Sequence, residues 1–164
     1  MALVVETGDA LSTAESYISV ADADARATAF GNTAWTGTDA AKEAALRRAT
    51  AFMEQRYGSR WRGTRVLREQ ALSWPRYGVS ANGFDQPSTF VPADVANACA
   101  DLAVRALTET LNSDLERGIA REKVGPIETE YDPYGSQAKR YPAIDQMLAP
   151  WLNGGGGSGR LIRA

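Results

Sequence analysis

The amino-acid sequence predicts a mainly α fold: a small helical bundle with a long central helix, one short β arm or hairpin and an extended C-terminal tail. Apolar residues recur with the 3.6-residue period of a helix in several segments, whereas only one short segment alternates as a strand does. A run of glycines follows the last apolar turn. We therefore expect one helical domain over residues 1–152 and a tail over residues 153–164, since a chain of 164 residues can bury a core of its own.

Two helices are expected in the first third of the chain. The first begins in SVADADARATAF, where Ser19 acts as the N-cap and Gly31 follows the last turn. The second covers about residues 40–57, after a cap at Thr38 or Asp39. Its apolar stripe, at helical spacing, consists of Ala45, Leu46, Ala49, Phe52, Met53 and Tyr57.

Residues 58–90 break the helical pattern. They contain four glycines and two prolines, which predicts a long loop region with at most one short helix around residues 68–72. Loops of this length in a compact domain are usually functional or interfacial. The next helix starts at Pro92 and extends for about 20 residues. Because it is apolar over most of its circumference, we expect it to be the central helix, with Cys99 as a packing residue.

A period of two residues appears in residues 123–132, around Gly125 and Pro126, and predicts a strand or a hairpin arm. A short last helix is expected to start at Pro142. Its inward-facing residues are expected to be Ile144, Met147, Leu148 and Leu152. Residues 153–159 then form a leash with a mean span of about 15 Å.

The residue types that serve catalysis are scarce. The chain has no histidine and one cysteine, which removes every Ser-His or Cys-His arrangement and argues against a zinc or iron–sulfur site within one chain. No Walker-type phosphate loop occurs. The acidic pairs Asp22/Asp24 and Glu128/Glu130 are interpreted as solvated surface. We therefore expect no enzymatic activity and no cofactor.

The localisation signals are equally sparse. The first residues lack the basic and apolar regions of a secretory signal, and no segment approaches the roughly 20 apolar residues that span a bilayer. A single cysteine allows no internal disulfide, which is typical of a reducing cytoplasm. We expect no membrane partner.

Charge is distributed unevenly along the chain. From Lys42 to Arg76 there are nine basic residues against three acidic ones, whereas the residues before Lys42 include one arginine and six acidic residues. This asymmetry suits an oligomer in which oppositely charged faces meet, or a polyanionic partner. It is equally compatible with arginines that are solvated or paired within the domain.

A single-stranded-DNA binder is the alternative function that this charge suggests. The stretch RYGSRWRGTR interleaves arginines with aromatic rings, as proteins that bind unpaired nucleotides do. The residues that would carry it are Arg56, Arg60, Trp61, Arg62 and Arg65.

The closing residues RLIRA predict a docking tail. Burying Leu161 and Ile162 contributes about 3–6 kcal/mol, while ordering five residues costs about 5–10 kcal/mol. A single tail therefore docks poorly, but many tethered copies that meet a partner with many matching sites bind well. The tail indicates a multi-copy assembly protein, and strand addition to a partner's sheet is a plausible mode.

Several segments together resemble the head–tail adaptor (connector) proteins of tailed bacteriophages and prophages, sequences that are also labelled DnaT-like single-stranded-DNA-binding proteins. The likeness covers nearly the whole chain. The segments are VVETGDALSTAESYISVADADA, GNTAWTG, KEAALRRAT, WRGTRV, QALSWPR, VPADVANACADLAVRAL, VGPIETEYD, YPAIDQMLAP and GGGGSGRLIRA.

This resemblance implies a mainly helical subunit that assembles, commonly as a twelve-membered ring, beneath the portal of the virion. The ring would extend the channel through which genomic DNA passes without sequence recognition and would join a downstream neck or tail-completion protein. Assembly would take place in the cytoplasm of the bacterial host. The family has no catalytic residues. Its C-terminal portal-binding segment corresponds here to Arg160, Leu161, Ile162 and Arg163.

Contacts between subunits or with the neck are assigned as hypotheses. They involve the basic segment and the predicted arm. The residues are Arg60, Trp61, Arg62, Arg65, Glu128, Glu130 and Tyr131.

Overall fold

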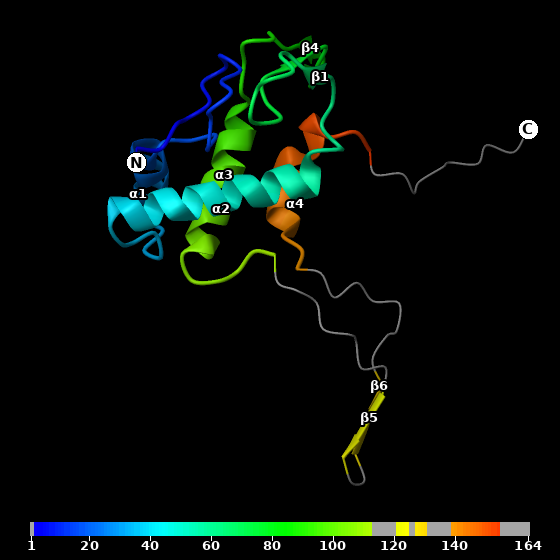
Figure 1. The fold of residues 1–164 in the computed structure, drawn as a ribbon. Helices are drawn as coiled ribbons and strands as arrows, with labels where there is room; N and C mark the ends of the chain where they lie inside the picture. Colours follow the sequence, from blue (N-terminus) through cyan, green and yellow to red (C-terminus); the bar gives the residue numbers. More distant parts are fainter. Residues whose placement is uncertain (1, 113–120, 125–126, 131–138, 155–164) are drawn as a thin grey trace, which may run out of the picture.

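Side-chain caps begin the first two helices, α1 (Val20–Ala29) and α2 (Asp39–Tyr57). The Ser19 hydroxyl accepts a hydrogen bond from the Asp22 amide at 3.0 Å, and the Thr38 hydroxyl accepts one from the Ala41 amide at 3.3 Å. Each such cap stabilises a helix by about 1 kcal/mol. The two predicted helices and their caps are confirmed in the computed structural model, which describes residues 2–112, 121–124, 127–130 and 139–154 (Figure 1).

The third helix, α3 (Ala93–Ala106), is shorter than predicted. It has 14 residues, and Pro92 is its N-cap residue. After Ala106 the chain leaves the helix in a turn, which allows Leu111 to pack into the core with 5% of its surface exposed. The apolar residues keep their helical spacing beyond Ala106, but the helix itself ends there because Leu111 is buried from a turn.

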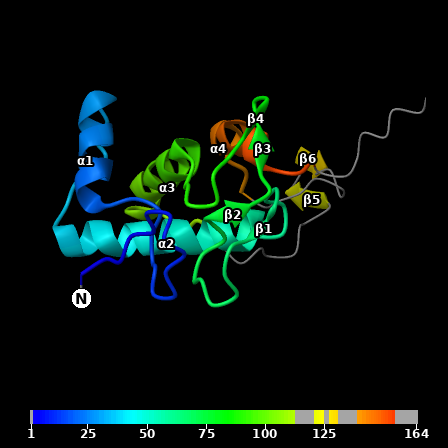
Figure 2. The ribbon, with the colours of Figure 1, turned by 90° about the horizontal axis from the view of Figure 1, so that it is seen from above.

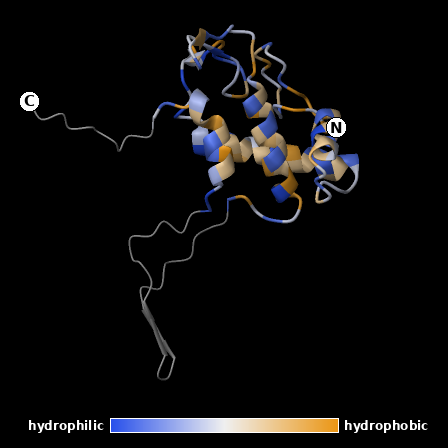
Figure 3. Cartoon of the chain, turned by 180° about the vertical axis from the view of Figure 1, so that it is seen from behind, coloured by the Kyte–Doolittle hydropathy of each residue, from blue (hydrophilic) through white to orange (hydrophobic). Residues whose placement is uncertain are grey.

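The last helix, α4 (Pro142–Leu148), continues into a 3-10 turn, η1 (Ala149–Trp151). Ile144 and Leu148 are buried in it, and Met147 is partly buried against the core. Figure 2 shows α1, α3 and α4 side by side along α2, and α3 contacts each of the other three helices. Figure 3 shows hydrophobic positions among hydrophilic ones along the helices, and the buried core takes side chains from all four helices.

Short antiparallel strand pairs complete the described fold. In the first pair β1 (Thr64–Arg65) lies beside β2 (Arg76–Tyr77), and in the second β3 (Ser80–Ala81) lies beside β4 (Phe84–Asp85). The third pair is a hairpin of β5 (Arg121–Val124) and β6 (Ile127–Glu130), in the segment where the sequence predicts an arm.

The predicted fold class is wrong. The described residues hold four α-helices, but the longest of them is α2 and no bundle forms around a long central helix (Figure 1). Residues 58–90 contain no helix around 68–72, and they supply core side chains from strands and turns: Trp74, Val79 and Ala81 are at most 2% exposed. The protein is a helix-rich but mixed small domain.

Two ion pairs tie the N-terminal part to α2 and predict a dependence on pH. Arg47 donates to Glu15 at 2.9 Å and Lys42 donates to Asp24 at 2.8 Å, and these bonds hold the pKa of each carboxyl below its ordinary value, 4.5 for Glu15 and 3.8 for Asp24. A lowered pKa in the folded state contributes stability above the ordinary value, and that stability is lost as the pH falls through the folded-state pKa. Replacing Glu15 with Gln is therefore expected to lower the urea midpoint at neutral pH. Below the pKa values of Glu15 in both the folded and the unfolded state, the variant and the unmodified protein are expected to have the same urea midpoint. A difference in midpoint that persists at that pH would contradict this prediction.

Candidate nucleic-acid interface

A buried guanidinium organises the predicted loop region. Arg76 has 8% of its surface exposed, and its side chain donates to three carbonyl oxygens: Arg62 at 2.6 Å, Gly63 at 2.6 Å and Ser73 at 3.1 Å. Burial lowers the pKa of Arg76 from its ordinary value. Because its donors are directed at the protein backbone, Arg76 holds β1 against β2 and is not available to a ligand.

Glu54 on α2 fastens the same region to the helix. Its carboxylate accepts hydrogen bonds from the Ser73 amide at 3.1 Å and the Ser73 hydroxyl at 2.6 Å, and from the Tyr17 hydroxyl. Burial, followed by the charge of Glu54, raises the pKa of Tyr17 well above its ordinary value, so Tyr17 remains a donor. One carboxylate thus joins three segments of the chain.

Trp61, predicted to face nucleotides or a partner subunit, is a core residue. It is 2% exposed, and its ring lies 5.9 Å from that of Tyr57 and 5.8 Å from that of Trp74, centroid to centroid. Trp74 in turn contacts Trp151 edge to face at 5.7 Å. Because the Trp61 ring is covered by other side chains, it offers no exposed face on which a base can stack.

The arginines predicted beside Trp61 are largely occupied by their own chain. Arg56 lies 3.8 Å from the Asp145 carboxylate, and Arg62 donates to the carbonyls of Leu152 at 3.1 Å and Ser80 at 3.0 Å. Arg60 differs: its backbone carbonyl accepts the Asn153 amide at 2.7 Å, but the Nε of its guanidinium is buried without a hydrogen-bond partner. These contacts hold α4 and residues 152–153 against residues 56–62.

Arg65 is the most accessible of the predicted cations. Its side chain is 43% exposed, donates to the Gln70 carbonyl at 3.4 Å and lies 4.0 Å from Glu54. Gln70 is buried and bonds to the backbone of Leu67, Leu72 and Pro75, so it holds the loop that carries the exposed Arg68. Two arginines therefore project from a well-supported loop.

Two aromatic rings that the sequence analysis did not single out are exposed on the same region. Tyr77 is 69% exposed and Phe84 is 72% exposed, and Val66 and Leu67 on the adjoining loop are also exposed. Tyr77 ends β2 and Phe84 begins β4, with the β3–β4 turn between them. The dipeptide Asn82-Gly83, with φ values of +54° and +83°, predicts the tight turn of the hairpin that carries Phe84, but it does not indicate which rings are exposed.

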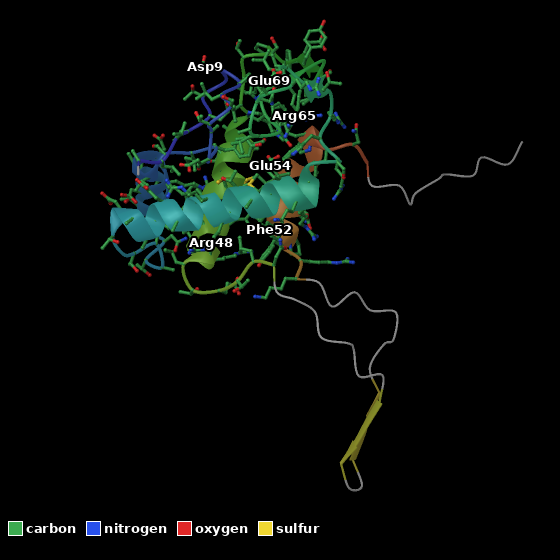
Figure 4. The ribbon with its side chains drawn as sticks, in the orientation of Figure 1. Asp9, Arg48, Phe52, Glu54, Arg65 and Glu69 are labelled. Atoms are coloured by element: carbon green, nitrogen blue, oxygen red, sulfur yellow. The ribbon has the colours of Figure 1, made fainter. Side chains whose placement is uncertain are left out.

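We call the four exposed side chains Arg65, Arg68, Tyr77 and Phe84, which come from the segment that runs from β1 to β4, the aromatic–arginine surface. Figure 4 places Arg65 and Glu54 on one side of α2, and Arg48 and Phe52 on the other. Asp9 and Glu69 also lie on the Arg65 side of α2 in this view.

Gly63 provides a test of this architecture. Its φ is +68°, and an added Cβ would lie 2.3 Å from the Tyr77 carbonyl oxygen and 2.8 Å from the side chain of Val79. Replacement by alanine is expected to destabilise the protein by about 2 kcal/mol, from backbone strain and steric overlap. Gly78 is the matched control, because its φ is +70° and no atom lies within 4 Å of an added Cβ. Urea unfolding measures both variants, and equal losses would contradict the steric contribution.

The charge asymmetry of the sequence is partly neutralised within the chain. Lys42 and Arg47, at the start of the basic stretch, pair with Asp24 and Glu15 from the acidic first part. The sequence is compatible with an oligomer, a polyanionic partner or pairing within the domain. For Lys42 and Arg47 the structure shows pairing within the domain.

The other predicted site residues lie at or beyond the limits of the described chain. Tyr131 and the portal-binding residues 160–163 are outside the described residues. Glu128 and Glu130 lie in β6, in register with Lys123 and Arg121 of β5. No group of three or more potential metal ligands occurs in the part of the chain that the structure describes.

Among the described helices, none combines the length and the hydrophobicity needed to cross a membrane. The sequence model of one protein family, described as “Putative DnaT-like ssDNA binding protein”, matches residues 1–164. No curated protein and no solved structure matches the chain.

Proposed function

This chain belongs, over its whole length, to the family of DnaT-like ssDNA-binding proteins, and on that premise we propose that it binds single-stranded DNA through the aromatic–arginine surface. The observation that supports the proposal is the exposure of Tyr77 and Phe84, each about 70% accessible, on the region that also carries Arg65 and Arg68. Large aromatic side chains of soluble domains are mostly covered, and exposed rings beside cations are typical of surfaces that stack bases.

The proposed mode of binding has two components. Successive bases stack on Tyr77 and Phe84, which is tolerant of sequence because every base offers a π face. Arg65 and Arg68 contact the phosphates and position the strand. This role differs from the one predicted from the sequence, because the stacking rings are Tyr77 and Phe84 and not Trp61.

The chain's overall charge sets the expected strength of binding. A formal net charge of −2 gives no long-range attraction to a polyanion, so affinity depends on local contacts. Two phosphate contacts predict a slope of log K against log salt concentration of about −1.4. Binding is therefore expected to be weak to moderate and to have a shallow salt dependence.

The test is fluorescence anisotropy with labelled oligothymidine and with a duplex of equal length, over a salt series. We expect tighter binding to the single strand, the shallow slope given above and little change in tryptophan fluorescence, since Trp61 and Trp74 are buried. No binding at low salt, or equal affinity for the duplex, would contradict the proposal.

We propose the head–tail adaptor of a tailed phage as the second candidate. Besides the resemblance along the chain, the observation that favours it is the exposed apolar group Val66, Leu67, Tyr77 and Phe84, which suits contact with a protein as well as with bases. Deleting residues 160–164 is expected to abolish attachment to a portal ring while circular dichroism shows an intact fold. Attachment that persists after the deletion would contradict the role of the tail, and oligonucleotide binding distinguishes the two candidates.

A further inference from the structure

A groove of about 500 Å³ lies on the side of α2 opposite the aromatic–arginine surface. Its apolar lining consists of Ala51 and Phe52 from α2 and Leu107 and Leu111 from the turn that follows α3. Arg48 lies at its edge and donates to the Ala106 carbonyl at 2.7 Å. Its positive charge therefore stabilises the C-terminal end of α3. Three other hollows of the described chain measure about 360, 20 and 390 Å³.

Both ends of the segment 113–138 are attached to the rim of this groove. The segment begins after Asn112, which lines the groove and donates to Gln55 on α2. It ends before Lys139, whose ammonium group donates to the Glu109 carboxylate at 2.9 Å and to the Thr110 carbonyl at 3.2 Å. The groove and the root of this segment are therefore one structural unit.

The charge of this segment complements that of the rim. Residues 113–138 contain six acidic and three basic side chains, a net charge of −3, whereas the rim of the groove carries Arg48 and Lys139 against Glu109. The C-terminal segment 155–164 has the opposite sign, with two arginines and no acidic side chain. Charge thus favours the 113–138 segment over the C-terminal segment as the occupant.

The hairpin within this segment has an apolar end. The register pairs Val124 with Ile127, the two residues that flank Gly125 and Pro126, while the remaining strand residues are charged or polar. An apolar end of this size suits the apolar lining of the groove, and charged strands suit its rim.

We propose that the hairpin of one copy of this chain, residues 121–130, docks in the groove of a second copy. Because the twelve residues from 113 to 124 can reach up to about 40 Å, whereas α2 with 19 residues is about 28 Å long, this segment is long enough to place the hairpin on a second copy. A contact between two different surfaces of the same chain is head-to-tail, and repetition of it produces rings or filaments. This contact is independent of DNA binding, since it lies across α2 from the aromatic–arginine surface.

Cysteine cross-linking between differently tagged full-length chains tests the contact. One chain carries Val124→Cys and the other Ala51→Cys, an exposed groove position, while the native Cys99 is fully buried. Mild oxidation is expected to link the two chains. Ala40→Cys, exposed at the far end of α2, is the matched control and is expected to remain largely unlinked to Val124→Cys.

Sedimentation velocity provides the second measurement. The unmodified chain is expected to associate with increasing concentration, and Ile127→Asp is expected to remain monomeric with an unchanged thermal unfolding midpoint and unchanged oligonucleotide affinity. A third variant carries Val124→Cys and Ala51→Cys in one chain. Three results would overturn the proposal: a monomer at every concentration, equal cross-linking of Ala51→Cys and Ala40→Cys, or a disulfide that forms within this third variant but not between the singly substituted chains. None of them bears on the DNA proposal.

Discussion

Replacing both Tyr77 and Phe84 with alanine is expected to weaken binding of single-stranded DNA by about 30-fold or more. Each base stacked on an aromatic ring contributes about 1–3 kcal/mol, and 1.4 kcal/mol corresponds to a factor of ten in affinity. Both rings are about 70% exposed, so little packing is lost when they are removed. Anisotropy titration of labelled oligothymidine measures the change.

Phe30→Ala is the matched control for this variant. Phe30 is 74% exposed, like the two other rings, but it follows α1 and lies under the guanidinium of Arg26, away from the loop region. Its replacement is expected to leave DNA affinity unchanged. A double variant that binds as tightly as the unmodified chain, or a control that loses as much, would contradict stacking on Tyr77 and Phe84.

Replacing Glu54 with Gln is expected to lower the free energy of unfolding by about 3–4 kcal/mol. Hydrogen bonds to a charged acceptor are worth about 1.5–3 kcal/mol each, and the Glu54 carboxylate accepts them from Ser73 and Tyr17. The side-chain amide of Gln has the same shape as the carboxylate, but one of its oxygens is replaced by an NH2 donor. When this donor faces the amide and hydroxyl of Ser73, their hydrogen bonds are lost. Urea denaturation measures the loss.

Glu43→Gln on the same helix is the control. Glu43 pairs with Arg47 at 3.3 Å across one turn of α2, and a partly exposed pair of this kind contributes only a few tenths of a kcal/mol. The effect of Glu54→Gln is therefore expected to be several times larger. Equal losses in the two variants would show that Glu54 does not join α2 to the loop region.

The sequence predicts helices where local chemistry decides them. Ser19 and Thr38 cap α1 and α2 as expected, because a hydroxyl followed by an apolar helical period acts within one turn of chain. The hairpin at residues 121–130 also follows from a local period of two. The end of α3 does not follow, because the burial of Leu111 from a turn depends on core contacts with segments far away in the sequence.

The sequence and the structure point to the same region, residues 58–90, but to different aromatic rings. Loops of this length are expected to be functional or interfacial, and the sequence favours Trp61 because an aromatic ring among arginines is typical of nucleic-acid binders. The chain instead buries Trp61 against Tyr57 and Trp74 and exposes Tyr77 and Phe84. No local pattern separates these cases, because which ring is covered depends on contacts between distant segments.

By itself, then, the sequence determined the starts of the helices, the hairpin, the scarcity of catalytic residue types and the likeness along the chain. Only the tertiary structure decided that the domain combines helices with short strand pairs and which aromatic rings reach the surface. It also decided that Arg76 and Glu54 form hydrogen bonds between segments of the same chain. The physical reason is range: caps and periodicity act over a few residues, whereas burial and ion pairing join residues far apart in the sequence, such as Tyr17, Glu54 and Ser73.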